Sequence, residues 1–166
     1  MIIKGVVAED FLNYKEPSMF IAFPHCTFKC EKECGKKGMC QNSPLAYQED
    51  IIVFAPDIVK LYLKNDITKA VVLGGLEPFD SFNDVKEFIN CFRANTNDTI
   101  IIYTGYKEDE IAPYIKELEI FDNIIVKFGR FIPNNTPRFD EVLGITLASD
   151  NQYAKHIGAN KNDKNQ

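Results

Sequence analysis

The sequence lacks any long hydrophobic run. No apolar stretch approaches the roughly 18 residues that a membrane-spanning helix needs, so we expect no membrane span. The N-terminal stretch MIIKGVVAEDF, residues 1–11, also lacks the long apolar segment and small-residue cleavage site of a secretory signal peptide. From these two absences we expect a cytoplasmic protein that does not bind a membrane.

Basic residues are too few for a nucleic-acid-binding protein. The chain has 19 Lys and Arg against 24 Asp and Glu, a net charge of −5, and it therefore lacks the basic surface that such proteins present. Its 166 residues, 45% of them hydrophobic, are enough for one domain with a sizeable core. We predict a single domain over residues 1–158 and a polar, disordered tail, ANKNDKNQ, over residues 159–166.

Histidine is also scarce, whereas cysteine is concentrated. The two histidines are His25 and His156, and a lone histidine is more often structural than a ligand. Four of the five cysteines lie in HCTFKCEKECGKKGMC, residues 25–40. Disulfides are disfavoured because the total is odd and a cytoplasmic protein keeps its thiols reduced. A zinc ion or an iron–sulfur cluster remains, while Cys91, inside a predicted helix, is interpreted as a small hydrophobic residue.

Apolar runs alternate with amphipathic segments along the chain, and this pattern predicts an α/β fold. Continuous apolar strands that alternate with helices indicate a mostly parallel sheet. A complete eight-stranded barrel needs about 250 residues, so we predict a partial (β/α) barrel with an open mouth. The chain after residue 130 is mixed and loop-rich. The predicted strands are 17–23, 69–75, 98–105 and 123–129, and the predicted helices are 55–65, 81–95 and 107–119.

Each predicted strand is followed by an unusual loop. The cysteine loop, GGLEPF, TGYKED and GRFIP come after the four strands in that order. Ligands of parallel sheets bind beyond the carboxyl ends of the strands, so these loops are expected to converge on one site. Gly74, Gly75 and Gly105 are candidates for close backbone approach to a ligand, and Glu77 for binding an ammonium group. Taken singly, each of them also fits an ordinary turn.

The combination of motifs resembles a known superfamily. A CxxxC pair after the first strand, a further cysteine, and a GG-x-E-P turn after the second strand resemble the radical S-adenosylmethionine superfamily. The pieces EDFLNYKEPSMFIAFPHCTFKC, VVLGGLEPFD, IIIYTGY, VKFGRFIP and LASDNQ are similar to the activating proteins of anaerobic ribonucleotide reductases. The resemblance runs from about residue 9 to about residue 157.

The resemblance implies a cofactor, a reaction and partners. Three thiolates would hold a [4Fe–4S] cluster, and S-adenosylmethionine would chelate its remaining iron. Reductive cleavage would give a 5′-deoxyadenosyl radical, which takes a hydrogen atom from a glycine of a large glycyl radical enzyme, here an anaerobic ribonucleoside-triphosphate reductase. An electron donor such as flavodoxin or ferredoxin is a second implied partner. The cofactors carry the chemistry, and no further catalytic side chain is implied.

The third cluster ligand departs from the usual CxxxCxxC spacing of the superfamily. Cys26 and Cys30 keep the first interval, and the third ligand is Cys34 or Cys40. We favour Cys40, because CQN resembles the third cysteine of the family with asparagine, here Asn42, two residues later. Residues 31–39 are then a polar insertion of the kind that surface loops tolerate. The residue before Cys40, aromatic in the family, is here a methionine.

The resemblance also assigns further positions. Gly74, Gly75 and Glu77 match the turn that meets the amino group of S-adenosylmethionine, and Asn42 and Gly105 are further cofactor-binding candidates. The terminal asparagine–glutamine pair of the activating proteins corresponds to residues 151–152. A carboxylate that often follows the fourth strand is missing, and its role falls to Lys127, to Arg130, or to no residue.

Two other functions compete with the activating-protein interpretation. The first is another radical S-adenosylmethionine enzyme that acts on a peptide or a small molecule. The second is a zinc-binding interaction module that uses all four loop cysteines. The zinc hypothesis accounts better for Cys34, but it leaves the GGLEPF turn and the converging strand ends unexplained.

Overall fold

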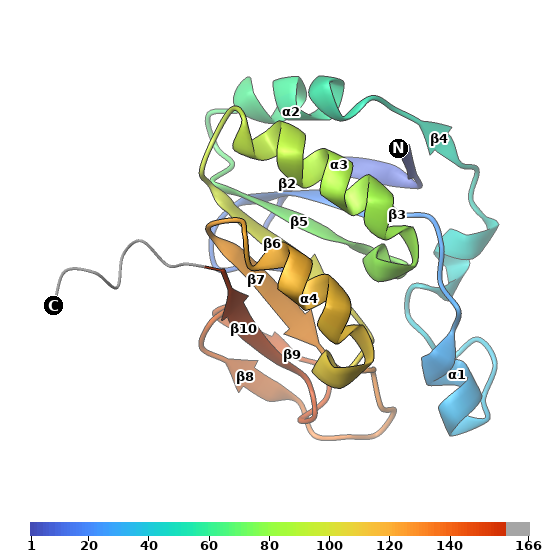
Figure 1. The fold of residues 1–166 in the computed structure, drawn as a ribbon. Helices are drawn as coiled ribbons and strands as arrows, with labels where there is room; N and C mark the ends of the chain where they lie inside the picture. Colours follow the sequence, from blue (N-terminus) through green and yellow to red (C-terminus); the bar gives the residue numbers. More distant parts are fainter. Residues whose placement is uncertain (159–166) are drawn as a thin grey trace, which may run out of the picture.

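The computed structural model describes residues 1–158; the predicted tail, 159–166, lies outside the described residues. Three longer helices, α2, α3 and α4, cover one face of a central sheet (Figure 1). None of the helices in the described part is long and apolar enough to cross a membrane. The strands are β1 (Ile2–Ile3), β2 (Gly5–Asp10), β3 (Ser18–Phe23), β4 (Ile51–Ile52), β5 (Ala70–Gly75), β6 (Thr99–Tyr103), β7 (Ile124–Phe128), β8 (Arg138–Asp140), β9 (Ile145–Leu147) and β10 (Tyr153–Ile157). The helices are α1 (Lys29–Cys34), η1 (Ser43–Tyr47), α2 (Ala55–Leu63), η2 (Pro78–Ser81), α3 (Phe82–Arg93), η3 (Glu108–Ile111) and α4 (Ala112–Leu118).

The central sheet has six strands in the order β10-β7-β6-β5-β3-β2. The four inner strands, β3, β5, β6 and β7, run parallel, and β2 and β10 pair antiparallel at the two ends of the order. The predicted α/β class and mostly parallel sheet are therefore confirmed. The strand order is open, with β2 and β10 at its ends, so a partial barrel stays a prediction.

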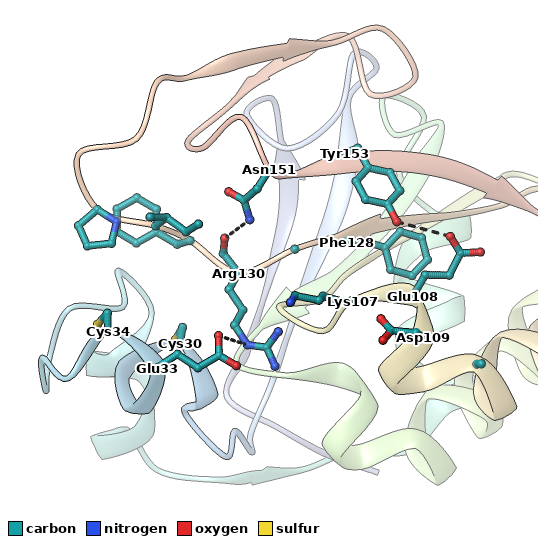
Figure 2. A pocket seen from close by; sticks show the side chains of 15 residues that line it. Cys30, Glu33, Cys34, Lys107, Glu108, Asp109, Phe128, Arg130, Asn151 and Tyr153 are labelled. Carbon is teal, nitrogen blue, oxygen red and sulfur yellow. Dashed lines mark hydrogen bonds and ion pairs between the residues drawn. The ribbon is translucent and has the colours of Figure 1, made fainter.

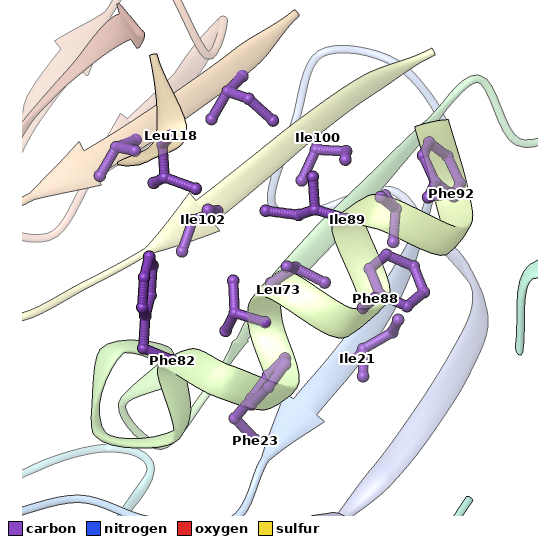
Figure 3. Close-up of a cluster of buried hydrophobic side chains, with 14 of the residues drawn as sticks. Ile21, Phe23, Leu73, Phe82, Phe88, Ile89, Phe92, Ile100, Ile102 and Leu118 are labelled. Carbon is purple, nitrogen blue, oxygen red and sulfur yellow. The ribbon is translucent and has the colours of Figure 1, made fainter. Parts of the chain in front are cut away.

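The inner strands are buried on both faces, which explains why they read as unbroken apolar runs. Every residue of β5 and every residue of β7 is buried. Side chains alternate between the two faces of a strand. Leu73, Ile102 and their neighbours meet the helices (Figure 3), whereas Val72, Ile101 and Ile125 meet Tyr14 and the β8–β9 hairpin.

Helical periodicity places one apolar face of each long helix on the sheet. In α3, Phe82, Val85, Phe88, Ile89 and Phe92 are buried, at the spacing of one helical face. The predicted helix 107–119 instead begins as η3 and continues as α4. Proline cannot donate a backbone hydrogen bond, so it is tolerated in a first turn, and Pro113 stands in the first turn of α4.

The sequence analysis missed the two edge strands. Strands β2 and β10 each leave part of their residues exposed, so their sequences, GVVAED and YAKHI, lack the continuous apolar character of the inner strands. The segment after residue 130, interpreted as mixed and loop-rich, in fact carries β8, β9 and β10. The predicted loop 25–40 also contains the short helix α1, which has no buried residue and therefore gave no periodic signal.

Phe88 provides a test of this core. Its side chain is fully buried and stacks on Phe92, with ring centroids 5.5 Å apart. Replacing Phe88→Ala is expected to lower the free energy of unfolding by about 3–5 kcal/mol, because buried surface is lost and a cavity remains. Phe54→Ala, at a phenylalanine that is 70% exposed, is the matched control and should change it by less than about 0.5 kcal/mol. Urea unfolding measures the free energy of unfolding of both variants. A loss in Phe54→Ala as large as that in Phe88→Ala would contradict the described packing.

Candidate iron–sulfur site

A cavity of about 400 Å³ lies at the carboxyl ends of the inner strands. Its wall takes residues from the cysteine loop, from the turn after β5, from residues 103–105 at the end of β6, and from Lys127 and residues 129–131 at the end of β7. Parallel pairing places these four strand ends on one edge, so the predicted convergence of the loops is confirmed. The β8–β9 hairpin supplies a further wall with residues 145–148, which the sequence analysis did not assign.

Three thiols line this cavity: Cys26, Cys30 and Cys40. The Cys26 Sγ accepts a hydrogen bond from the backbone N–H of Phe28, at 3.2 Å, and the Cys40 thiol is a hydrogen-bonding neighbour of Cys30. Burial raises the pKa of Cys26 to about 12 and that of Cys30 to about 11. Metal binding to such thiols must therefore release their protons.

Cys34 lies elsewhere. Its Sγ is exposed, lies 3.1 Å from Met39 Sδ, and is absent from the wall of the 400 Å³ cavity. Gly35 ends α1 just after it, in a left-handed conformation with φ +69°. Of the two candidates for a third ligand, the one that shares a cavity with Cys26 and Cys30 is Cys40.

The donor set suits a cluster better than a single ion. Among residues 1–158, no group of three or more His, Cys, Asp or Glu side chains is placed to bind one metal ion. The zinc hypothesis requires all four loop cysteines around one ion, and the geometry does not bring them together. In a [4Fe–4S] cluster each thiolate binds a different iron, and the three thiols that line this one cavity would supply three such ligands.

Glu77 is a buried carboxylate on the same wall. Its Oε1 accepts hydrogen bonds from Thr104 Oγ1, at 2.8 Å, and from the Phe79 N–H, at 3.2 Å, and its Oε2 accepts one from the Gly105 N–H, at 2.8 Å. Burial raises the pKa of Glu77 to about 7, although these three donors act in the opposite direction. Thr104 was not predicted from the sequence as a site residue. Its place directly after β6, at the carboxyl end of an inner strand, is the signal that could have indicated it.

Of the other predicted cofactor residues, Asn42, Gly75 and Gly105 line the cavity, and Gly74 does not. Gly75 has φ +83°, and a Cβ there would lie 2.8 Å from Ala22 Cα, so glycine is required by contact with β3. Gly74 does not line the cavity, and a Cβ there would meet the Phe20 ring at 2.9 Å. Gly105 lines the cavity and donates to the carboxylate, and Asn42 Nδ2 donates to the Gly75 carbonyl at 2.6 Å. The asparagine thereby ties the Cys40 segment to the glycine turn.

Lys127 is a buried cation on the wall of the cavity. Its Nζ donates to the Gly129 carbonyl at 3.0 Å, and burial lowers the pKa of Lys127 to about 8, while Glu77 and Cys40 nearby act in the opposite direction.

The asparagine–glutamine pair, residues 151–152, has a structural role in this protein. Asn151 Nδ2 donates to the Arg130 carbonyl at 2.9 Å, and the side-chain Nε2 of Gln152 donates to the Gly129 carbonyl at 3.2 Å. The pair thus holds the turn after β7 against the cavity.

Arg130 separates this cavity from a second one. The second cavity, of about 920 Å³, lies between α1, η3 and residues 128–133 (Figure 2). Arg130 lines both cavities and forms ion pairs with Glu110, at 2.6 Å, and with Glu33 of α1, at 3.3 Å. The hydrogen bond from the Arg130 guanidinium holds the pKa of Glu110 down at about 2, and the ion pair of Arg130 with Glu33 connects α1 to the end of β7.

A match to a protein family identifies the class of cofactor. Residues 18–144 match the family described as the 4Fe-4S single cluster domain, over more than half of the chain. The chain belongs to this family. It is therefore an iron–sulfur protein, of a family found in radical S-adenosylmethionine proteins. Searches of curated proteins and of solved structures gave no match.

The ligand assignment leads to a direct test. Cys40→Ala is expected to lose most of the iron and sulfide that the wild type takes up on anaerobic reconstitution, because two thiolates remain in the cavity. Cys34→Ala should retain them, as should the control Cys91→Ala, whose thiol lies in α3. Iron and acid-labile sulfide per chain are measured. Loss of the cluster in Cys34→Ala with retention in Cys40→Ala would reverse the assignment.

Proposed function

We propose that this protein is a radical S-adenosylmethionine enzyme that installs a glycyl radical in an anaerobic ribonucleotide reductase. The observation that carries the proposal is the shared cavity. Three thiols, of Cys26, Cys30 and Cys40, line the same space as the buried Glu77 and Lys127. Thiolates are the expected ligands of a [4Fe–4S] cluster, and three of them leave one iron for a substrate.

The charges of the cavity suit the amino-acid end of S-adenosylmethionine. Glu77 presents a carboxylate fixed by three hydrogen bonds, which would bind the ammonium group. Lys127 offers a buried cation for the carboxylate group. Each charge is costly to bury alone, and a zwitterionic ligand would compensate both. The apolar parts of the wall, including Phe20 and Phe131, suit the adenine ring.

The bound cluster would supply one electron to the sulfonium, so that the C–S bond breaks to give methionine and a 5′-deoxyadenosyl radical. That radical would take one hydrogen atom from the glycine and be released as 5′-deoxyadenosine. Cys26, Cys30 and Cys40 would hold the cluster, and Glu77 and Lys127 would hold the amino-acid end of S-adenosylmethionine beside it. No side chain need transfer a proton in this sequence.

A protein substrate is supported by the open sheet. The six strands of the central sheet have an open order and the β8–β9 hairpin covers one side of the cavity, so the remaining mouth would admit a partner's loop. Anaerobic ribonucleotide reductase is proposed as the partner because the ordered motifs from about residue 9 to about residue 157 resemble those of its activating proteins.

Glu77→Gln tests the binding role of the carboxylate. The amide keeps one acceptor oxygen but loses the charge, so affinity of the reconstituted protein for S-adenosylmethionine is expected to fall about tenfold to a hundredfold. Equilibrium dialysis measures the dissociation constant. Glu49→Gln, at an exposed glutamate, is the matched control and should leave it unchanged. An unchanged constant in Glu77→Gln would contradict the assigned contact.

The reaction itself is tested with a partner. The reconstituted protein is incubated anaerobically with S-adenosylmethionine, dithionite and the anaerobic ribonucleotide reductase of the same organism. We expect 5′-deoxyadenosine and a glycine-centred doublet in electron paramagnetic resonance. Formation of 5′-deoxyadenosine without the doublet would redirect the proposal to another peptide or small molecule. Absence of both from a cluster-loaded protein would refute it.

A further inference from the structure

Arg130 is a buried cation on the boundary between the two cavities. Its residue is 6% exposed, and it stands just beyond the end of β7. The cavity of about 400 Å³ and the cavity of about 920 Å³ both include Arg130 and Cys30 in their walls. The hydrogen bond to Glu110 raises the pKa of Arg130, and the nearby Glu33 and Cys30 act in the same direction. The guanidinium is therefore a neighbour of one of the three thiols of the cavity.

Two of the three guanidinium nitrogens of Arg130 have donor groups without an acceptor. Nη2 donates to Glu110 Oε1 at 2.6 Å. Nε lies 3.3 Å from a carboxylate oxygen of Glu33, which makes an ion pair but no hydrogen bond. Nε and Nη1 are both buried, and neither has a hydrogen-bond partner among residues 1–158. A buried donor without an acceptor is costly, so these two nitrogens indicate an acceptor that binds beside them.

The charge of Arg130 acts on the cavity more strongly than the charges of the two carboxylates paired with it. The side chain of Glu33 is 59% exposed and that of Glu110 is 25% exposed, so water screens both. The arginine side chain is only 6% exposed, so its positive charge is screened much less. The acceptor that the free donors indicate should therefore be negatively charged.

A [4Fe–4S] cluster held by three thiolates is an acceptor of this kind. Its thiolate and sulfide sulfurs accept hydrogen bonds, and its negative charge increases when it takes up an electron. Hydrogen bonds to the sulfurs and positive charges nearby stabilise the more negative, reduced state, and both therefore raise the reduction potential. Arg130 shares the wall of the cavity with Cys26, Cys30 and Cys40, so its donors lie on the side where such a cluster would bind.

We propose that Arg130 sets the reduction potential of the cluster: its Nε and Nη1 donate hydrogen bonds to sulfur atoms of the bound cluster, and its charge favours the reduced state. Figure 2 shows the guanidinium beside Glu33 of α1, the helix that carries Cys30, and this ion pair holds the helix against the arginine. A raised potential has its purpose in the proposed reaction, which needs a reduced cluster, whereas the contact itself requires only the cluster.

The test is a redox titration of the cluster in the absence of S-adenosylmethionine. Reconstituted protein is reduced stepwise with titanium(III) citrate in the presence of redox mediators, so that each oxidised cluster takes up one electron from titanium(III). Electron paramagnetic resonance measures the reduced cluster at each potential. The signal is normalised to bound iron, so the midpoint potential does not depend on how many chains carry a cluster.

Arg130→Met removes the charge and the donors at a similar side-chain length. The ratio of reduced to oxidised cluster at a fixed potential is expected to fall at least about tenfold, which for one electron is a midpoint about 59 mV more negative. Arg130→Lys keeps the charge but loses the planar set of donors, so its midpoint should lie between the two. Arg138→Met is the matched control, because this arginine of β8 is exposed and lines neither cavity, and it should keep the wild-type midpoint.

Glu33→Gln separates an electrostatic role of the arginine from a structural one. Like Arg130→Met, it breaks the ion pair that connects α1 to the end of β7. It removes a negative charge, however, so the ratio of reduced to oxidised cluster should rise, by only about twofold to threefold because the glutamate is exposed. The two variants should therefore shift the midpoint in opposite directions. Glu33 is not part of the core, so this variant still tests the proposal if Arg130→Met does not fold.

Three results would overturn the proposal. Equal midpoints in the wild type and Arg130→Met would show that the guanidinium does not act on the cluster; weaker binding of S-adenosylmethionine in that variant would then assign the free donors to that ligand. Shifts of the same sign in Arg130→Met and Glu33→Gln would show only a structural ion pair. A ratio that stays the same or falls in Glu33→Gln would contradict the electrostatic argument. Since no step of the titration uses S-adenosylmethionine, absence of 5′-deoxyadenosine would count against the proposed reaction alone.

Discussion

Parallel pairing of the four inner strands is the constraint on which the rest of the structure depends. Strands β3, β5, β6 and β7 are buried on both faces, so they leave almost no exposed side chain along their length. Functional groups must then stand in the loops beyond the strands. Because the strands point the same way, the loops that follow Phe23, Gly75, Tyr103 and Phe128 meet at one edge. The parallel pairing that forms the sheet therefore also brings the residues of the site together.

Glu77 shows how that edge is held together. Its carboxylate accepts hydrogen bonds from its own turn, at Phe79, and from the loop after β6, at Thr104 and Gly105. Buried carboxylates need such partners, since an unpaired charge in the interior is strongly unfavourable. The same interactions fix the direction of the carboxylate toward the cavity. The carboxylate of Glu77 thereby joins the turn after β5 to the loop after β6.

The cysteine loop is built on a different principle. Helix α1 contributes nothing to the core, and a few polar contacts place it: Arg130 with Glu33, and Asn42 with the Gly75 carbonyl. Where apolar burial is lacking, metal binding can supply much of the ordering free energy. The loop can therefore accept an insertion between its second and third cavity thiols without disturbing the sheet, because loop length itself costs little entropy.

The sequence by itself determined the four inner strands, the long helices and the edge at which the site forms, because fully buried strands and one-sided helices leave strong hydrophobic patterns. It also indicated Cys26, Cys30 and Glu77 as members of one site. The edge strands β2 and β10 stayed hidden, since half-exposed strands pair through backbone groups that carry no side-chain signal. The sequence favoured Cys40 over Cys34 as the third ligand only through the resemblance of CQN, and the tertiary structure added that Cys40, and not Cys34, shares a cavity with Cys26 and Cys30. It also showed that the side chains of residues 151–152 donate hydrogen bonds to the turn after β7. Contacts between residues far apart in the chain depend on how the loops pack, and spacing along the sequence does not encode that.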